Sequence, residues 1–186
     1  MDGQHNYPTI DQFVAIEKKT AAIMADAKLR VLISKISNLS LGKSLSELII
    51  AKRPDTLKSD NYTINLNSLE EIVYVSANTC KKILNGTTKS IKLETLLCFC
   101  AGLKLEPVLS RYLIAKAGLS ITIETDINNV YNTLIDDFYE YGIDAWNYAL
   151  DAAGMTMLGQ SNVDEIQNRL SDFRKEKENA LKSAKW

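Results

Sequence analysis

Apolar side chains recur at roughly every third or fourth position through most of this chain of 186 residues. That period gathers apolar residues on one face of a helix, whereas β-strands alternate between apolar and polar residues. Only residues 121–125 (ITIET) are rich in β-branched side chains. One short strand would have no partner, so we interpret this stretch as a linker into the next helix. The pattern therefore predicts an all-α protein.

A long helical pattern follows a polar start and runs from residue 9 to about residue 36. Its apolar positions are Ile10, Phe13, Val14, Ala21, Met24 and Val31. An apolar stripe on a helix of this length has to be buried, either against the rest of the chain or against a second copy. The sequence therefore predicts a long N-terminal helix, which can also build a homodimer.

Residues 68–97 contain two short amphipathic segments that meet near Ser76, followed by a polar loop and a third helical segment. Three apolar positions are expected to face inward: Leu69, Cys80 and Ile83. Ser76 can cap the second segment, and Asn85 with Gly86 forms a stop signal at its end. This is the order of a helix-turn-helix reader of DNA, in which one helix packs on the helix before it and exposes a polar face.

Three stretches resemble the Cro/repressor-type (Xre) helix-turn-helix family: residues 83–86 (ILNG), 93–97 (LETLL) and 98–107 (CFCAGLKLEP). The likeness covers about residues 41–109, and residues 41–53 (LGKSLSELIIAKR) are similar to the family's first helix. The resemblance implies a repressor-like helical domain whose helix at residues 77–84 enters the major groove of double-stranded DNA.

The same resemblance implies a set of DNA contacts. The residues directed toward base edges would be Asn78, Thr79 and Lys82. The residues directed toward phosphates would be Ser76, Lys81, Thr88 and Lys89. Asn can pair with adenine through two hydrogen bonds, and Lys reaches phosphate or guanine. The alternative is a helical hairpin whose lysines are merely solvated.

Two residues depart from the family pattern. Glu70 stands where the family has a small residue, and Tyr74 stands where it has glycine in the turn. A bulky residue is costly where φ must be positive, so we expect the turn to be displaced or its register to be shifted. The insertion at residues 54–67 is also rich in turn formers and longer than a compact repressor domain needs.

Residues 128–141 and 143–153 flank Gly142 and predict a helical hairpin. Its candidate core residues are Val130, Leu134, Ile135, Phe138, Trp146 and Leu150. Four tyrosines add aromatic density that suits a core, a dimer seam or a docking site for another protein: Tyr131, Tyr139, Tyr141 and Tyr148. The hairpin is similar to C-terminal modules attached to Xre-like regulators of Firmicutes and their phages.

The last segment, residues 162–186, combines spaced apolar residues with dense charge, which suits a coiled-coil seam or a terminal helix laid on the body. The chain is therefore expected to have three parts. Residues 1–38 form a tail and the long helix, residues 39–118 form the helix-turn-helix domain, and residues 119–186 form an acidic, aromatic-rich helical module.

Charge is distributed unevenly, although 22 Lys and Arg nearly balance 23 Asp and Glu. Residues 41–92 contain eight basic and five acidic residues, a net charge of +3. Residues 119–160 contain seven acidic residues and no basic one. This asymmetry fits a middle segment that faces DNA and a C-terminal part that faces something else, or else an ordinary solvated face.

Neither catalysis nor a metal or other cofactor is expected. His5 is the only histidine, and it lies in the polar start, which removes the commonest general base and zinc ligand from any folded site. Cys98 and Cys100 lie two positions apart on a predicted helix, so their side chains point in different directions and do not easily share an ion. Residues 37–44 (SNLSLGKS) nearly match a phosphate-binding loop, but they lack its first glycine and follow a helix.

The three cysteines and the lack of an apolar leader or membrane-spanning segment predict a cytoplasmic protein with reduced thiols. Two functions remain. The first is a sequence-specific DNA-binding transcriptional regulator, a repressor, acting as a homodimer on paired half-sites. The second is a protein-binding module on a helix-turn-helix scaffold, comparable to a phage inhibitor or an antitoxin, which contacts a protein partner through its acidic C-terminal helices.

Overall fold

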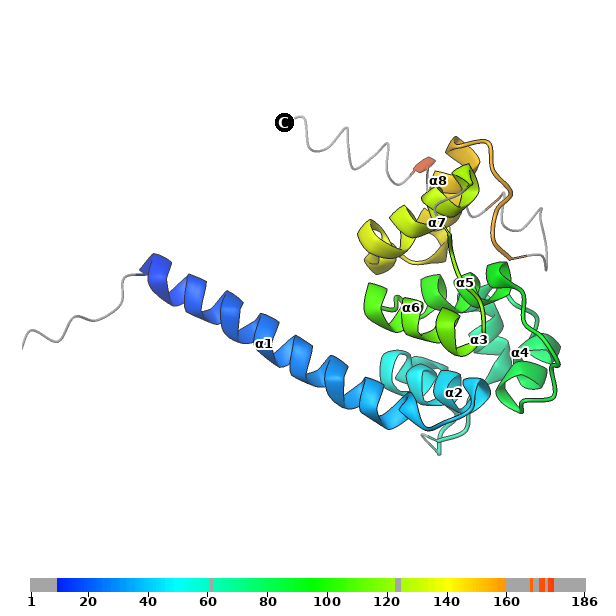
Figure 1. Ribbon diagram of the computed structural model, residues 1–186, viewed down its shortest axis with the longest axis horizontal. Coiled ribbons are helices and arrows are strands. Elements are labelled where there is room, and N and C mark those ends of the chain that lie inside the picture. Colours follow the sequence, from blue (N-terminus) through cyan, green and yellow to red (C-terminus); the bar gives the residue numbers. More distant parts are fainter. Residues whose placement is uncertain are drawn as a thin grey trace, which may run out of the picture. The chain divides into compact units, whose positions relative to one another are not determined.

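The computed structural model describes residues 10–60, 62–122 and 125–159, together with residues 168, 171, 172, 174 and 175. This part of the chain forms eight α-helices and two short 3-10 helices, with no strand in it (Figure 1). The prediction of an all-α protein is therefore confirmed. The chain divides into two units, Met1–Asn38 and Leu39–Trp186. The second unit contains both the expected 39–118 domain and the expected 119–186 module.

The first unit contains one long helix, α1 (Ile10–Ser37), of 28 residues. Its bounds match the helix that the apolar period predicts. Met24 is 55% exposed and Val31 is 70% exposed. These two residues lie seven positions apart and therefore share one face of the helix. α1 thus presents apolar side chains to solvent in the single chain.

The second unit begins with α2 (Leu41–Lys52), whose first turn is capped by the hydroxyl of Ser40 accepting from the amide of Lys43. A short 3-10 helix, η1 (Pro54–Thr56), opens the predicted insertion, and a bridge between Leu57 and Ile64 closes its turn. Two short helices follow, α3 (Leu66–Val73) and α4 (Ala77–Leu84). Their three expected inward residues, Leu69, Cys80 and Ile83, are all buried, so that prediction is confirmed.

Two glycines inside helices set how closely these elements approach. A Cβ on Gly42 of α2 would lie 2.5 Å from the carbonyl oxygens of Ile83 and Leu84, at the end of α4. A Cβ on Gly102 would lie 2.5 Å from the carbonyl oxygen of Ile72 in α3. No real Cβ is found so close to backbone atoms, so only glycine permits this packing. The position of α4 against α2 therefore depends on the missing side chain of Gly42.

Helix α5 (Leu93–Gly102) is the centre of the second unit, because its residues from Leu96 to Gly102 are all buried. Helix α6 (Pro107–Lys116) begins at a proline, whose fixed φ suits the first turn of a helix, and ends before Gly118. In Figure 1, α5 and α6 lie between α2 on one side and α7 and α8 on the other. The core of the unit is continuous through α5.

The C-terminal hairpin consists of α7 (Asp126–Asp137), η2 (Tyr139–Tyr141) and α8 (Ile143–Ala152). Gly142 takes a φ of 83° between the last two. Four of the predicted core residues are buried and Val130 is half-buried: the buried ones are Leu134, Ile135, Trp146 and Leu150. Phe138 was expected in the core, and this was wrong, because it is 39% exposed. α7 has already ended at Asp137, so Phe138 leaves the apolar stripe, and only its carbonyl turns inward to accept from the indole N–H of Trp146.

Two further findings complete the fold. Arg111 of α6 donates to both carboxylate oxygens of Asp136 at 2.8 and 2.7 Å, which joins α6 to α7.

The proposed terminal helix at residues 162–186 lies outside the described residues, except for the five positions named above. Among the described helices, none has both the length and the apolar content needed to cross a bilayer.

Candidate nucleic-acid interface

The turn between α3 and α4 is closed by Tyr74, which takes the left-handed conformation with φ 54° and ψ 30°. Its amide donates to the carbonyl of Glu70 at 2.9 Å, as in an ordinary helix end. Tyr74 itself thus adopts the positive φ at the end of α3. Tyrosine accepts the strained backbone because its side chain gains contacts that glycine would lack.

Tyr74 gains these contacts from the C-terminal hairpin. Its phenol donates a hydrogen bond to Asp144 of α8 at 2.5 Å. Gly159 comes so close on the other side that a Cβ there would lie 2.5 Å from the Cβ of Tyr74. The turn of the α3–α4 pair is therefore held by residues about 70 and 85 positions further along the chain.

The first turn of α4 is capped twice. The hydroxyl of Ser76 accepts from the amide of Thr79 at 3.4 Å, which confirms the predicted cap. The carboxylate of Glu70 accepts from the amide of Ala77 at 3.0 Å. A negative charge at this end is favourable because the free amides and the helix dipole are positive there. Glu70 thus fixes the start of α4.

The outer face of α4 is a continuous polar stripe. Asn78, Lys81, Lys82 and Asn85 are all exposed and follow the spacing of one helix face. The opposite face carries the buried Cys80 and Ile83. The side chains of Lys81 and Lys82 make no hydrogen bond or ion pair within the described residues, so their ammonium groups are available to another molecule.

The other predicted contact residues divide into two groups. Thr88 and Lys89 are exposed in the loop that follows α4. Ser76 and Thr79 are half-buried, and the Ser76 hydroxyl donates to that of Thr79 at 2.9 Å. The structure therefore brings Asn78, Lys81 and Lys82 together on the surface, whereas Ser76 and Thr79 mainly bond to each other.

The charge around α4 is positive. Residues 72–93 contain four lysines and no acidic residue. Three basic residues elsewhere in the second unit are paired: Arg53 bonds to Asp55, Lys52 to Glu106 and Arg111 to Asp136. The strongest local concentration of unpaired positive charge in this segment is thus the α4 helix and the loop that follows it.

The three cysteines are free thiols buried in the core. Burial raises the pKa of Cys80, Cys98 and Cys100 to about 12 in each case. No group of three potential metal ligands occurs among the described residues. The thiols act as small apolar side chains, in keeping with the sequence interpretation.

Sequence reasoning missed Asp144 and Gly159, which hold the turn from a distance. The only signal was Tyr74 itself, because a bulky residue in a position that requires positive φ implies a compensating contact somewhere. Nothing in the sequence indicated which residues would supply it.

Comparison with protein-family models, with curated proteins and with solved structures found no match.

Proposed function

We propose that this protein is a sequence-specific DNA-binding transcriptional regulator in which α3 and α4 act as a helix-turn-helix. The observation that carries the proposal is the polar stripe of α4. A groove-reading helix needs one face fixed by the protein and the other free for bases. In α4, Cys80 and Ile83 are buried while Asn78, Lys81 and Lys82 face solvent.

The contacts follow from this placement. Asn78 and Lys82 are assigned to base edges, because Asn pairs with adenine and Lys with guanine. Lys81, Thr88 and Lys89 are assigned to phosphates. Ser76 and Thr79 position the helix, since their hydroxyls are bonded to each other. Protein–DNA contacts of this kind need no cofactor.

Regulators of this type bind as dimers on half-sites about one helical turn apart. The exposed Met24 and Val31 of α1 offer an apolar stripe on which a second copy can pack. We therefore propose a homodimer that acts as a repressor by occupying DNA. Sedimentation of the wild type and of a Met24→Lys/Val31→Lys variant tests this part, and a dimer unaffected by the changes contradicts the assignment to α1.

The proposal is tested by selection from duplexes with a randomised core, followed by sequencing of the bound fraction. We expect an enriched inverted repeat with half-site centres about 10 base pairs apart. Lys81→Ala/Lys82→Ala should abolish enrichment, while Lys58→Ala/Lys104→Ala, two exposed lysines outside α1 and α4, should preserve it. A bound fraction with no enriched sequence contradicts sequence-specific reading.

One observation favours the second function, a protein-binding module. Phe138 and Tyr141 are 39% and 63% exposed, and their ring centroids lie 6.0 Å apart. The neighbouring Asp137 is exposed and pairs with no cation in the described part of the chain. Aromatic and acidic surface together suits a basic protein partner. If this surface is the functional one, Phe138→Ala/Tyr141→Ala abolishes activity in the cell, and Lys81→Ala/Lys82→Ala leaves it intact.

A further inference from the structure

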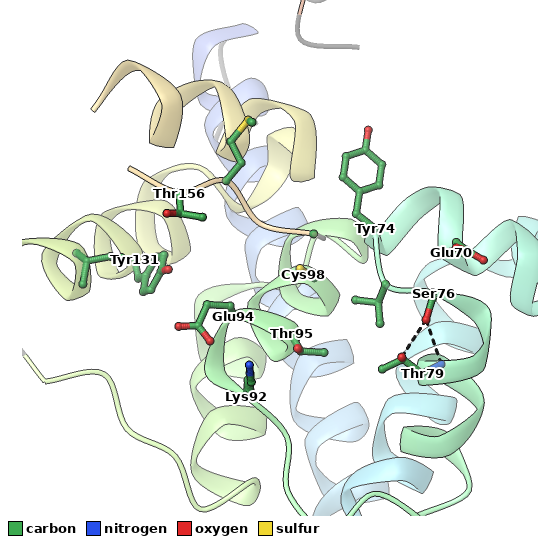
Figure 2. A pocket seen from close by; sticks show the side chains of 14 residues that line it. Glu70, Tyr74, Ser76, Thr79, Lys92, Glu94, Thr95, Cys98, Tyr131 and Thr156 are labelled. Carbon is green, nitrogen blue, oxygen red and sulfur yellow. Dashed lines mark hydrogen bonds between the residues drawn. The ribbon is translucent and has the colours of Figure 1, made fainter. Parts of the chain in front are cut away.

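A pocket of about 740 Å³ opens between the starts of α4 and α5, helix α7 and residues 156–159 (Figure 2). Natural sites for small molecules have volumes of about 300–1,000 Å³. The wall at residues 156–159 is fixed by Asn147, whose side chain forms hydrogen bonds of 3.0 and 2.7 Å with the backbone of Leu158. The pocket therefore has both the size and the fixed walls of a binding site.

Tyr131 supplies the first sign of a ligand. It is only 3% exposed, and Figure 2 shows its hydroxyl pointing into the pocket. Within the described residues this hydroxyl has no hydrogen-bond partner. Burial, and then the charge of Glu94, raises the pKa of the phenol, so the hydroxyl keeps its proton. The hydroxyl faces the pocket without a partner among the described residues, so a bound polar group can form a hydrogen bond with it.

Opposite charges line the pocket. Glu94 carries a carboxylate beside Tyr131, and this carboxylate pairs with no cation in the described part of the chain. Lys92 also lines the pocket and its ammonium is likewise unpaired there. No side chain caps the start of α5 at Lys92, so its first amides keep free N–H groups. Glu70 reaches the pocket too, but its carboxylate is bound to the amide of Ala77.

The geometry points to a binding site for a free α-amino acid with a bulky apolar side chain. Its carboxylate would lie at Lys92 and the free amides of α5, where a helix start and a cation both favour an anion. Its ammonium would donate to Glu94 and to the hydroxyl of Tyr131. Its side chain would lie against Ile127 and Met157, the apolar part of the wall.

The test uses free L-leucine, L-methionine, L-phenylalanine and L-tryptophan, each with its amide and its N-acetyl derivative. Binding is measured by calorimetry and by the shift in melting temperature. We expect at least one free amino acid to bind and to raise the melting temperature. The amide lacks the carboxylate charge of the amino acid, and the N-acetyl derivative lacks the ammonium charge. Each derivative should bind about tenfold or more weakly than the free amino acid, because it loses a charge-assisted hydrogen bond. If none of the four binds, the proposal is wrong.

Variants assign the binding to this pocket. Tyr131→Phe, Glu94→Gln and Lys92→Met should each weaken binding about tenfold or more. Lys58→Met, an exposed lysine away from the pocket, should leave it unchanged. Tyr131→Phe removes an unpartnered hydroxyl, so its melting temperature without ligand should not fall. Binding that is unchanged in all three pocket variants overturns the proposal. None of these measurements involves DNA, so they stand apart from the test of the DNA-binding function.

Discussion

The phenol of Tyr74 donates to the carboxylate of Asp144 at 2.5 Å, across 70 residues of sequence. One partner closes the turn before α4 and the other lies on α8 of the C-terminal hairpin. The hairpin therefore supports the turn that sets the direction of α4. If α4 reads DNA, any change that weakens this bond will also loosen the reading helix.

Removing the Tyr74 hydroxyl should lower the stability of the fold. Tyr74→Phe and Asp144→Ala are each expected to reduce the free energy of unfolding by about 1–2 kcal/mol, because a hydrogen bond to an ionised acceptor is lost. The double variant should cost little more than the larger single change. Urea denaturation of all four proteins measures the coupling, and additive losses would show that the two residues do not stabilise each other.

Gly159 should be far less tolerant of a side chain than Gly154. Both have positive φ, +88° and +68° respectively, but only Gly159 would place a Cβ against Tyr74. Gly154→Ala is expected to cost about 1 kcal/mol for backbone strain alone. Gly159→Ala adds the clash and should cost about 2 kcal/mol or more. Equal losses in thermal or urea denaturation would show that the close approach to Tyr74 is unimportant.

Helix propensity should fail to predict the effect of Gly42→Ala. Alanine normally stabilises a helix by about 1 kcal/mol relative to glycine. At position 42, however, the new Cβ would lie 2.5 Å from two carbonyl oxygens of α4, so we expect a net loss of stability. The matched control is Ala51→Gly on the exposed side of α2, which should cost about 1 kcal/mol. A stabilised Gly42→Ala protein would contradict the described packing of α2 on α4.

The buried thiols should make the stability of the folded protein depend on pH. Burial raises the pKa of the three thiols to about 12, whereas an unfolded thiol titrates near 8.5. Their contribution to stability is complete below about pH 8.5 and falls as the pH rises toward 12, since only the unfolded chain loses these protons there. In the native protein at pH 8, a disulfide reagent should react slowly with all three, and rapidly after urea is added. Rapid reaction without urea would show that the thiols are exposed.

The helices themselves could be predicted well from local patterns. The cap at Ser76, the stop at Asn85 and Gly86 and the inward residues of α3 and α4 are local properties of period and capping. The turn at Tyr74 could not be predicted, because the contacts that compensate its backbone strain come from Asp144 and Gly159. The prediction that Phe138 lies in the core failed for a related reason. α7 ends at Asp137, and the Phe138 carbonyl there accepts a hydrogen bond from the indole of Trp146, which lies eight residues further along the chain.

The candidate site was predictable only in part. Asn78, Lys81 and Lys82 share one exposed face because helix geometry alone puts them there. Thr79 differs, since its hydroxyl is bonded by Ser76 and it lines the pocket that also includes residues of α5. A pocket made by α4, α5, α7 and residues 156–159 depends on how distant segments pack, which sequence periodicity does not report.

The decisive test of DNA reading by α4 is the salt dependence of binding, measured by fluorescence anisotropy on a duplex carrying the selected sequence. The logarithm of the affinity should fall linearly with the logarithm of the salt concentration, with a slope set by the number of phosphates contacted. Lys81→Ala/Lys82→Ala should weaken binding and reduce that slope, by about 1 for each lysine that contacts a phosphate, while Lys58→Ala/Lys104→Ala should change neither. No binding by the wild type even at low salt, or equal binding by both double variants, would contradict the proposal that α4 reads DNA.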